Sequence, residues 1–198
     1  IDPNLVDSMP KGLTAVSGYD AITHAIEAYV SVMATNFTNS NSLEALKLLF
    51  RYLKRSYDSG KNDPIAREKV HYASTIAGMA FANAFLGICH SMAHKLGAMF
   101  HVPHGMANAL LINQVIKFNA TDKPTKQTAF PQYKFPCAKA KYGQIADELG
   151  LGGKNDDEKV ELLQQALVQM KKDLGLPMSI KEFGIEESEF LAKLDELV

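Results

Sequence analysis

Residues 13–32, LTAVSGYDAITHAIEAYVSV, carry the pattern that decides the fold class. Apolar side chains recur in this segment at intervals of three and four residues, as they do on one face of an α-helix. The same spacing returns over most of the remaining sequence, and β-branched runs do not alternate at a period of two between turn signals. We therefore expect an all-α domain, built as a multi-helix bundle.

Capping and turn residues set the expected helix boundaries. Asn41 or Ser42 can cap a second helix that ends near Gly60, and Asp63 followed by Pro64 is typical of the start of a third. The segment 119–136 contains three prolines and little periodicity, so we expect a long loop there. The expected helices span residues 13–32, 42–57, 65–85, 88–100, 106–118, 138–149, 156–174 and 187–197.

Length and composition favour one globular domain over residues 1–198. Hydrophobic residues make up 46% of the chain and charged residues 22%, which is ordinary for a globular protein. The formal net charge of -1 provides no overall field that would attract nucleic acid or an anionic membrane. We therefore expect a small molecule or another protein as the partner, with no nucleic acid and no membrane.

Cysteine usage and the N-terminus bear on location. Cys89 and Cys137 lie far apart without a CxxC pattern, which favours a reducing compartment, and we expect the cytoplasm. The chain begins at Ile1 without an initiator Met or a signal-peptide pattern. We interpret it as a piece of a longer polypeptide.

Asp20 and His24 form the first candidate metal-binding pair. They are four residues apart, so on a helix they project from one face and can chelate one cation. Alone, this pair is a weak signal, because the same spacing often produces a simple surface hydrogen bond.

A second cluster places His90, His94, His101 and His104 within fifteen residues, although the chain has only six histidines. His90 and His94 repeat the spacing of one helical turn, whereas His104 lies between a proline and a glycine, where one helix must end and another begin. A bend there would bring His104 back toward His90. The spacing leaves open whether His90, His94 or both bind a metal.

Together the two clusters offer one carboxylate and up to four imidazoles on otherwise apolar segments. A buried carboxylate is costly unless it is paired, and several close histidines are difficult to satisfy without a cation. Nitrogen and oxygen ligands without thiolate suit zinc, Fe(II), cobalt or nickel. The pattern argues against a Cys-rich structural zinc site and against an all-oxygen calcium site.

Two longer runs carry a family resemblance: MPKGLTAVSGYDAITHAIEAYVS at residues 9–31 and GICHSMAHKLGAMFHVPHGMANALL at residues 87–111. Both resemble the signatures of the iron-dependent, group III alcohol dehydrogenases, whose C-terminal helical domain has a dehydroquinate synthase-like fold. The resemblance implies that the metal, Fe(II) or zinc, is held by Asp20, His24, His90 and His104. It also implies that His94 faces the nicotinamide and the substrate, with a catalytic role in proton relay.

The segment NATDKPTKQTAFPQY at residues 119–133, with the helices after it, looks like the alcohol dehydrogenase portion of the bifunctional aldehyde-alcohol dehydrogenases. This implies NAD(H)-linked interconversion of a primary alcohol, ethanol in the first place, and its aldehyde. It also implies homo-oligomers or filaments of the full-length protein.

The nucleotide-binding domain of this family lies before the helical domain and contains a Gly-rich phosphate loop. Residues 1–198 contain no such loop, since the glycines at 150–153 do not follow a predicted strand. We therefore expect one helical metal-binding domain that lacks the nucleotide-binding domain and depends on it for most NAD(H) contacts. Such a fragment is expected to be inactive alone.

Two other function classes remain open: a metal-dependent hydrolase that uses the same ligands to activate water, and a non-catalytic module for filament assembly.

Among individual residues, Glu27 is either a partner of a metal ligand or an ordinary surface carboxylate. Aromatic and methionine side chains near the histidines are interpreted as core residues or, for some, as channel lining; they are Phe81, Phe85, Met92 and Met99.

Overall fold

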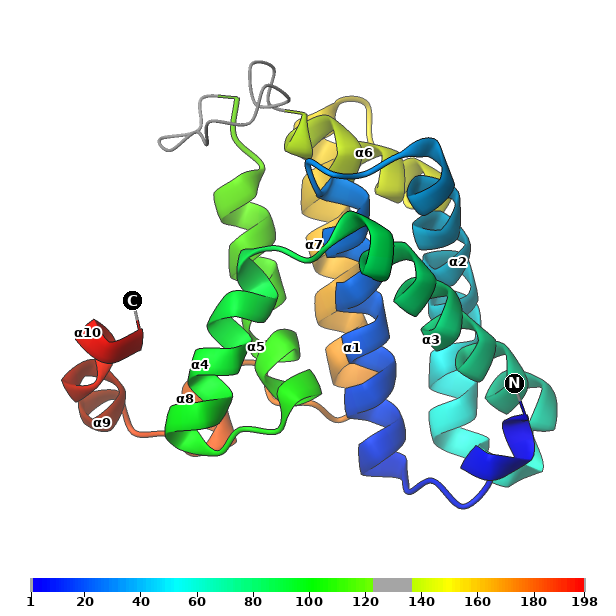
Figure 1. Cartoon of the computed structure of the whole chain (residues 1–198), viewed down its shortest axis with the longest axis horizontal. Helices are drawn as coiled ribbons and strands as arrows, with labels where there is room; N and C mark the ends of the chain where they lie inside the picture. Colours follow the sequence, from blue (N-terminus) through cyan, green and yellow to red (C-terminus); the bar gives the residue numbers. More distant parts are fainter. Residues whose placement is uncertain (1, 123–136, 198) are drawn as a thin grey trace.

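A computed structural model describes residues 2–122 and 137–197, and throughout them the regular structure is helical, without strands (Figure 1). The predicted all-α class is confirmed, while most of the predicted loop at 119–136 lies outside the described residues. The α-helices are α1 (Lys11–Val30), α2 (Asn36–Ser59), α3 (Pro64–Ala84), α4 (Ile88–Phe100), α5 (His104–Asn119), α6 (Ala138–Glu148), α7 (Asp156–Asp173), α8 (Ile180–Phe183), α9 (Glu187–Ala192) and α10 (Leu194–Leu197), with 3-10 helices η1 (Pro3–Val6) and η2 (Gly60–Asn62).

Helix α1 is the centre of the bundle and packs against α2, α3, α5 and α6 (Figure 1). Ile22 and Ile26 are fully buried on it, and burial of such a side chain contributes roughly 1.5–3 kcal/mol. Tyr19 is also buried and donates its hydroxyl hydrogen to the carbonyl of Leu167 in α7, at 3.2 Å. The helix that carries Asp20 and His24 is therefore fixed from several sides.

Helix α2 begins at Asn36, so the predicted caps at Asn41 and Ser42 are wrong. Thr35 is the N-cap: its hydroxyl accepts the N–H of Thr38, and the Thr38 hydroxyl accepts the N–H of Thr35. This is a capping box in which threonine takes the place of the usual Glu or Gln. For α3 the expectation is confirmed, since Asp63 caps a helix whose first residue is Pro64.

Helices α4 and α5 pack against each other and bring His90 and His104 near Asp20 in α1. Helix α4 ends at Phe100, and His101 adopts the left-handed conformation, with φ 54° and ψ 30°. The next helix begins three residues later, at His104. The predicted change of helix beside His104 is confirmed, and His104 occupies the first position of α5.

The C-terminal segment departs from its prediction. The sequence predicts one helix over residues 187–197, whereas the structure has the two short helices α9 and α10, preceded by α8. Gly184 ends α8 with φ 108°, a conformation that favours glycine. Phe190 in α9 stacks on Phe100 in α4, with ring centroids 5.9 Å apart, and this contact attaches the segment to the bundle.

Among the described residues, no single helix is long and apolar enough to cross a membrane. Helices α3 and α4 reach the required length and composition only as a pair, and they are bent by 106° at the break between them.

Candidate metal centre

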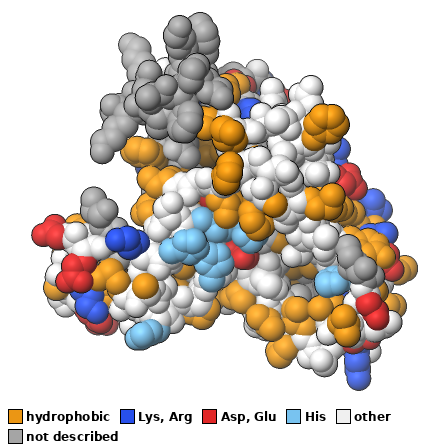
Figure 2. All heavy atoms as spheres, viewed as in Figure 1, with side chains coloured by type: hydrophobic (Ala, Val, Ile, Leu, Met, Phe, Trp, Pro, Cys, Tyr) orange, Lys and Arg blue, Asp and Glu red, His pale blue; other side chains and the backbone are white. Residues whose placement is uncertain are grey.

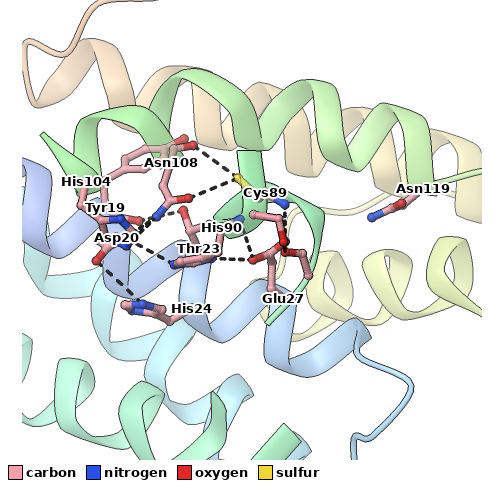
Figure 3. Close-up of polar contacts among 12 residues, drawn as sticks. Tyr19, Asp20, Thr23, His24, Glu27, Cys89, His90, His104, Asn108 and Asn119 are labelled. Carbon is pink, nitrogen blue, oxygen red and sulfur yellow. Dashed lines mark hydrogen bonds and ion pairs between the residues drawn. The ribbon is translucent and has the colours of Figure 1, made fainter. Parts of the chain in front are cut away.

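Four side chains from three helices converge at the middle of α1 (Figure 3). Asp20 and His24 project from α1 one turn apart, His90 comes from the first turn of α4, and His104 begins α5. Their ligand atoms all lie within 4.8 Å of one another. The structure therefore brings together the four residues that the sequence predicts as metal ligands.

The separations suit ligands that share one ion. The Nε2 atoms of His90 and His104 lie 3.7 Å and 3.6 Å from Asp20 Oδ1, and His24 Nε2 lies 3.8 Å from Asp20 Oδ2. These distances are too long for hydrogen bonds. Two ligand atoms that each lie about 2.1 Å from one tetrahedral ion are about 3.4 Å apart. The three distances to Asp20 exceed this value by 0.2–0.4 Å, and all four groups lie within 4.8 Å of one another.

One buried nitrogen supports this assignment. The His90 side chain is only 3% exposed, and its Nε2 atom has no hydrogen-bond partner among the described residues. A buried polar atom without a partner is costly and requires an explanation. A cation between His90 and Asp20 would satisfy it, and imidazole with carboxylate is a donor set that suits iron or zinc.

The centre is closed on one side and accessible on the other. The Asp20 and His24 side chains are 16% and 18% exposed, whereas His104 is 43% exposed. Figure 2 shows histidine side chains together near the middle of the molecular surface that faces the viewer, with hydrophobic side chains beside them. His94 is exposed and stacks on His104, with ring centroids 5.2 Å apart. His94 thus lies at the open side of the centre, outside the set of four.

Aromatic packing closes the side of His24. Phe81 in α3 stacks on the His24 ring, with centroids 4.4 Å apart, and Phe81 and Met99 are partly buried.

The assignment of Phe85 and Met92 to the core is wrong, because they are 63% and 41% exposed. Phe85 follows the end of α3 with φ 63°, and Met92 lies on an exposed side of α4.

Glu27 is a buried partner of a predicted ligand, which decides between its two interpretations. Its side chain is 3% exposed, and its Oε2 lies 2.5 Å from Nδ1 of His90. The same carboxylate accepts the backbone N–H of Cys89 at 2.8 Å and that of His90 at 3.3 Å. Gly87 leaves room for it, since a Cβ at that position would lie 2.8 Å from Glu27 Oε1.

Asn108 is a site residue that the sequence interpretation missed. It is fully buried and donates from Nδ2 to Asp20 Oδ1 at 2.7 Å, and the same nitrogen lies 3.2 Å from His104 Nε2. Cys89 is fully buried and donates its thiol hydrogen toward Asn108 Oδ1 at 3.5 Å. A signal was available, because Asn108 follows His104 by four residues in one helix and must share its face.

Burial and neighbouring charges shift the pKa values of these groups in different directions. Burial raises the pKa of Asp20, but His90, His24, Asn108 and His104 outweigh burial and lower it overall. Burial lowers the pKa of His24 to about 4 despite the nearby Asp20 carboxylate. Burial alone would lower the pKa of His90. The carboxylates of Asp20 and Glu27 raise that pKa by more than burial lowers it, to about 9. The centre therefore favours the anionic form of Asp20, the neutral form of His24 and the protonated form of His90.

Comparisons with known proteins give a matching family and individual relatives. The sequence model for the C-terminal part of the Fe-containing alcohol dehydrogenase family matches residues 14–196. The bifunctional aldehyde-alcohol dehydrogenase AdhE of Escherichia coli (strain K12) is 58% identical over 199 residues, covering 100% of this chain and 22% of that protein.

Two solved structures share the fold over 99% of this chain. An alcohol dehydrogenase from Oenococcus oeni is 34% identical, with a TM-score of 0.85, and 48% of that chain is covered. A sulfoacetaldehyde reductase from Bifidobacterium kashiwanohense, solved in complex with NAD+, is 26% identical, with a TM-score of 0.79 and 46% of its chain covered. The present chain thus spans about a fifth of the Escherichia coli relative and about half of these two proteins.

Proposed function

The chain belongs to the Fe-containing alcohol dehydrogenase family, and from this premise we propose that it forms the metal-binding part of an NAD-linked alcohol dehydrogenase. The reaction is the interconversion of a primary alcohol and its aldehyde, with ethanol and acetaldehyde as the proposed pair. The observation that carries the proposal is the convergence of Asp20, His24, His90 and His104 within 4.8 Å.

In this proposal these four residues hold one divalent ion, Fe(II) with zinc as the alternative, because their nitrogen and oxygen donors suit both metals. The chemistry that the metal supplies when bound is Lewis acidity toward an alcohol or aldehyde oxygen. Asp20 contributes the anionic ligand, and Asn108 holds it through the hydrogen bond to Oδ1.

Other residues shape the space around the ion. Phe81 covers one face of His24 and keeps water from that side. His94 lies at the open side, against His104, where its ring nitrogens can accept and release the proton that accompanies the interconversion. This position agrees with the proposed contact of His94 with the nicotinamide and the substrate.

NAD(H) is the proposed source and acceptor of hydride, a reaction that belongs to the nicotinamide itself. The sulfoacetaldehyde reductase solved with NAD+ supports this choice of cofactor. We propose that residues 1–198 are the metal-binding domain and that a separate nucleotide-binding domain supplies most NAD(H) contacts. The named relatives are about twice as long as this chain or longer, which supports the proposal of a separate nucleotide-binding domain.

Metal analysis tests the centre directly. The purified protein should contain about one divalent ion per chain, and His104→Ala should lose most of it. His71→Ala is the matched control, because His71 lies outside the group of four. Full metal retention in His104→Ala would overturn the assignment. NADH-dependent reduction of acetaldehyde, measured on a preparation that includes the nucleotide-binding domain, tests the reaction.

The hydrolase and assembly-module alternatives receive no support from these comparisons, because the family model and the three named proteins are dehydrogenases or a reductase. The cytoplasmic location, the absence of nucleic-acid and membrane partners, and the assembly into homo-oligomers or filaments remain predictions of the sequence.

A further inference from the structure

We propose that Glu27 is a positioning residue of the metal centre: it holds the Nδ1 proton of His90, so that the Nε2 lone pair of that ring faces the other ligands. The inference rests on the proposed function, since it assigns a task at the same centre. It concerns a residue that binds neither the metal nor the substrate.

The carboxylate of Glu27 first fixes the start of helix α4. The N–H groups in the first turn of a helix have no partner within that helix. Glu27 belongs to α1, yet its two oxygens accept the N–H groups of Cys89 and His90, at 2.8 Å and 3.3 Å. The N-cap residue Gly87 makes no side-chain capping bond. The cap of α4 is thus supplied by the helix that carries two of the ligands.

The same carboxylate also fixes the ring of His90. A carboxylate oxygen accepts hydrogen bonds, so we assign the 2.5 Å contact between Glu27 Oε2 and His90 Nδ1 to an Nδ1–H group that donates to Oε2. Nε2 then points away from Glu27, lies 3.7 Å from Asp20 Oδ1 and has no hydrogen-bond partner in the part of the chain that the structure describes. Figure 3 shows Glu27 and Asp20 on opposite sides of the His90 ring.

These two roles together distinguish Glu27 from an ordinary helix cap. Capping alone requires acceptors for backbone N–H groups, whereas the contact with Nδ1 is made to a ligand side chain. Metal-bound histidines commonly donate their second ring N–H to a carboxylate, which fixes ring orientation and raises ligand basicity. Because one carboxylate contacts both the backbone and the ring, His90 Nε2 is held at a defined position relative to α1.

The variant Glu27→Gln separates the roles. If the amide nitrogen replaced Oε1, it would face the Cys89 N–H at 2.8 Å, and two donors would oppose each other. In the other orientation the nitrogen faces the His90 N–H at the longer distance of 3.3 Å. The favoured orientation therefore keeps the oxygen toward Cys89 and places the amide nitrogen against His90 Nδ1. The amide then donates to Nδ1, the ring proton moves to Nε2, and the nitrogen that faces the ligands loses its lone pair.

The test is a titration of the metal-free protein with Co(II), followed by its absorption spectrum. Glu27→Gln should raise the dissociation constant about 10- to 100-fold and change the visible bands of bound Co(II). Glu68→Gln, the same substitution in α3 at a carboxylate paired with Lys69, should match the wild type in both. Wild-type affinity and spectrum in Glu27→Gln would overturn the proposal.

A second measurement covers the case in which Glu27→Gln does not fold. In wild-type protein with Zn(II) and ¹⁵N-labelled histidine, NMR should find the His90 proton on Nδ1 and the metal at Nε2; a proton on Nε2 would overturn the proposal. Normal Co(II) binding without alcohol oxidation by the complete enzyme would refute the proposed function while leaving the role of Glu27 intact. Failure of the wild type to bind Co(II) would overturn both.

Discussion

Gly105 lies so close to Val16 that a Cβ atom at residue 105 would come within 2.3 Å of the Val16 carbonyl oxygen. The same atom would lie 3.1 Å from Cβ of Asp20. The start of α5 can therefore rest directly on α1 only because residue 105 has no side chain. This contact places His104, the preceding residue, within 3.6 Å of Asp20.

We expect Gly105→Ala to force α5 away from α1, because the obstructing atom belongs to the backbone and cannot rotate aside. The free energy of unfolding should fall by about 1–3 kcal/mol, and affinity for Co(II) should fall with it. Gly78→Ala in α3 is the control, since a Cβ there meets no atom of the described residues within 4 Å. The control should gain about 0.5–1 kcal/mol. Urea denaturation followed by circular dichroism measures both; equal stabilities would contradict the argument.

Asn108→Ala should weaken metal binding through Asp20. The change removes the 2.7 Å hydrogen bond to Asp20 Oδ1 and leaves a largely buried carboxylate less well held. We expect a loss of about 1–3 kcal/mol in the free energy of unfolding and about 10- to 100-fold in metal affinity. Asn113→Ala removes a comparable bond to the Gln164 carbonyl, outside the centre. It should reduce stability without changing affinity, and an equal loss of affinity in both variants would refute the role of Asn108.

Phe85 is held in a strained backbone conformation at the end of α3, with φ 63° and ψ 177°. This region is essentially restricted to glycine, and strain of this kind costs of order 1–3 kcal/mol. Its side chain is 63% exposed, so little packing would be lost on removal. We expect Phe85→Gly to raise the free energy of unfolding by about 1 kcal/mol, whereas Phe85→Ala, which keeps the Cβ, should not. Chemical denaturation measures the free energy of unfolding of the two variants. A gain in stability in Phe85→Ala but not in Phe85→Gly would contradict the strain at residue 85.

Tyr142 should cause a loss of stability at alkaline pH. Burial raises the pKa of its phenol above the usual value of 10.0. Below pH 10 the phenol is protonated in both folded and unfolded protein, so its contribution does not vary. Above pH 10 the unfolded state ionises first, and stability falls by about 1.4 kcal/mol per pH unit.

Tyr142→Phe should remove the contribution of the phenol to this pH dependence. The free energy of unfolding of the variant should therefore fall less steeply between pH 10 and pH 11. At pH 8 it should lose about 0.5–1.5 kcal/mol, because the 3.3 Å hydrogen bond from Asn119 disappears. Unfolding free energies measured across this range provide the check. Parallel slopes for the two proteins would show that Tyr142 is not responsible.

The local chemistry of the centre could be predicted from the sequence because it depends on helical spacing. Asp20 and His24 are four residues apart, and that spacing alone places them on one face of α1. The second cluster was different. His90 and His94 have the same spacing, and nothing in their periodicity indicates which of them faces α1. The family resemblance, rather than geometry, assigned His90 and His104 as ligands and placed His94 toward the cofactor.

Tertiary structure decided what spacing could not. Glu27 could have been a surface carboxylate until α4 placed its N–H groups and the His90 ring against it. Likewise, the start of α2 was missed because the cap at Thr35 uses a second threonine in an uncommon capping box. The sequence places Phe85 in the core or along a channel, whereas in the structure it follows the end of α3 at a positive φ and is 63% exposed.

The sequence by itself therefore determined the helical class, the face shared by Asp20 and His24, and the residue types suited to a metal. Only the tertiary structure showed that His90 and His104 reach that face while His94 lies beside it, and that Glu27 and Asn108 hold the ligands. The reason is physical: helical periodicity is a property of neighbouring residues, whereas the approach of α4 and α5 to α1 depends on packing between distant segments, such as the contact of Gly105 with Val16.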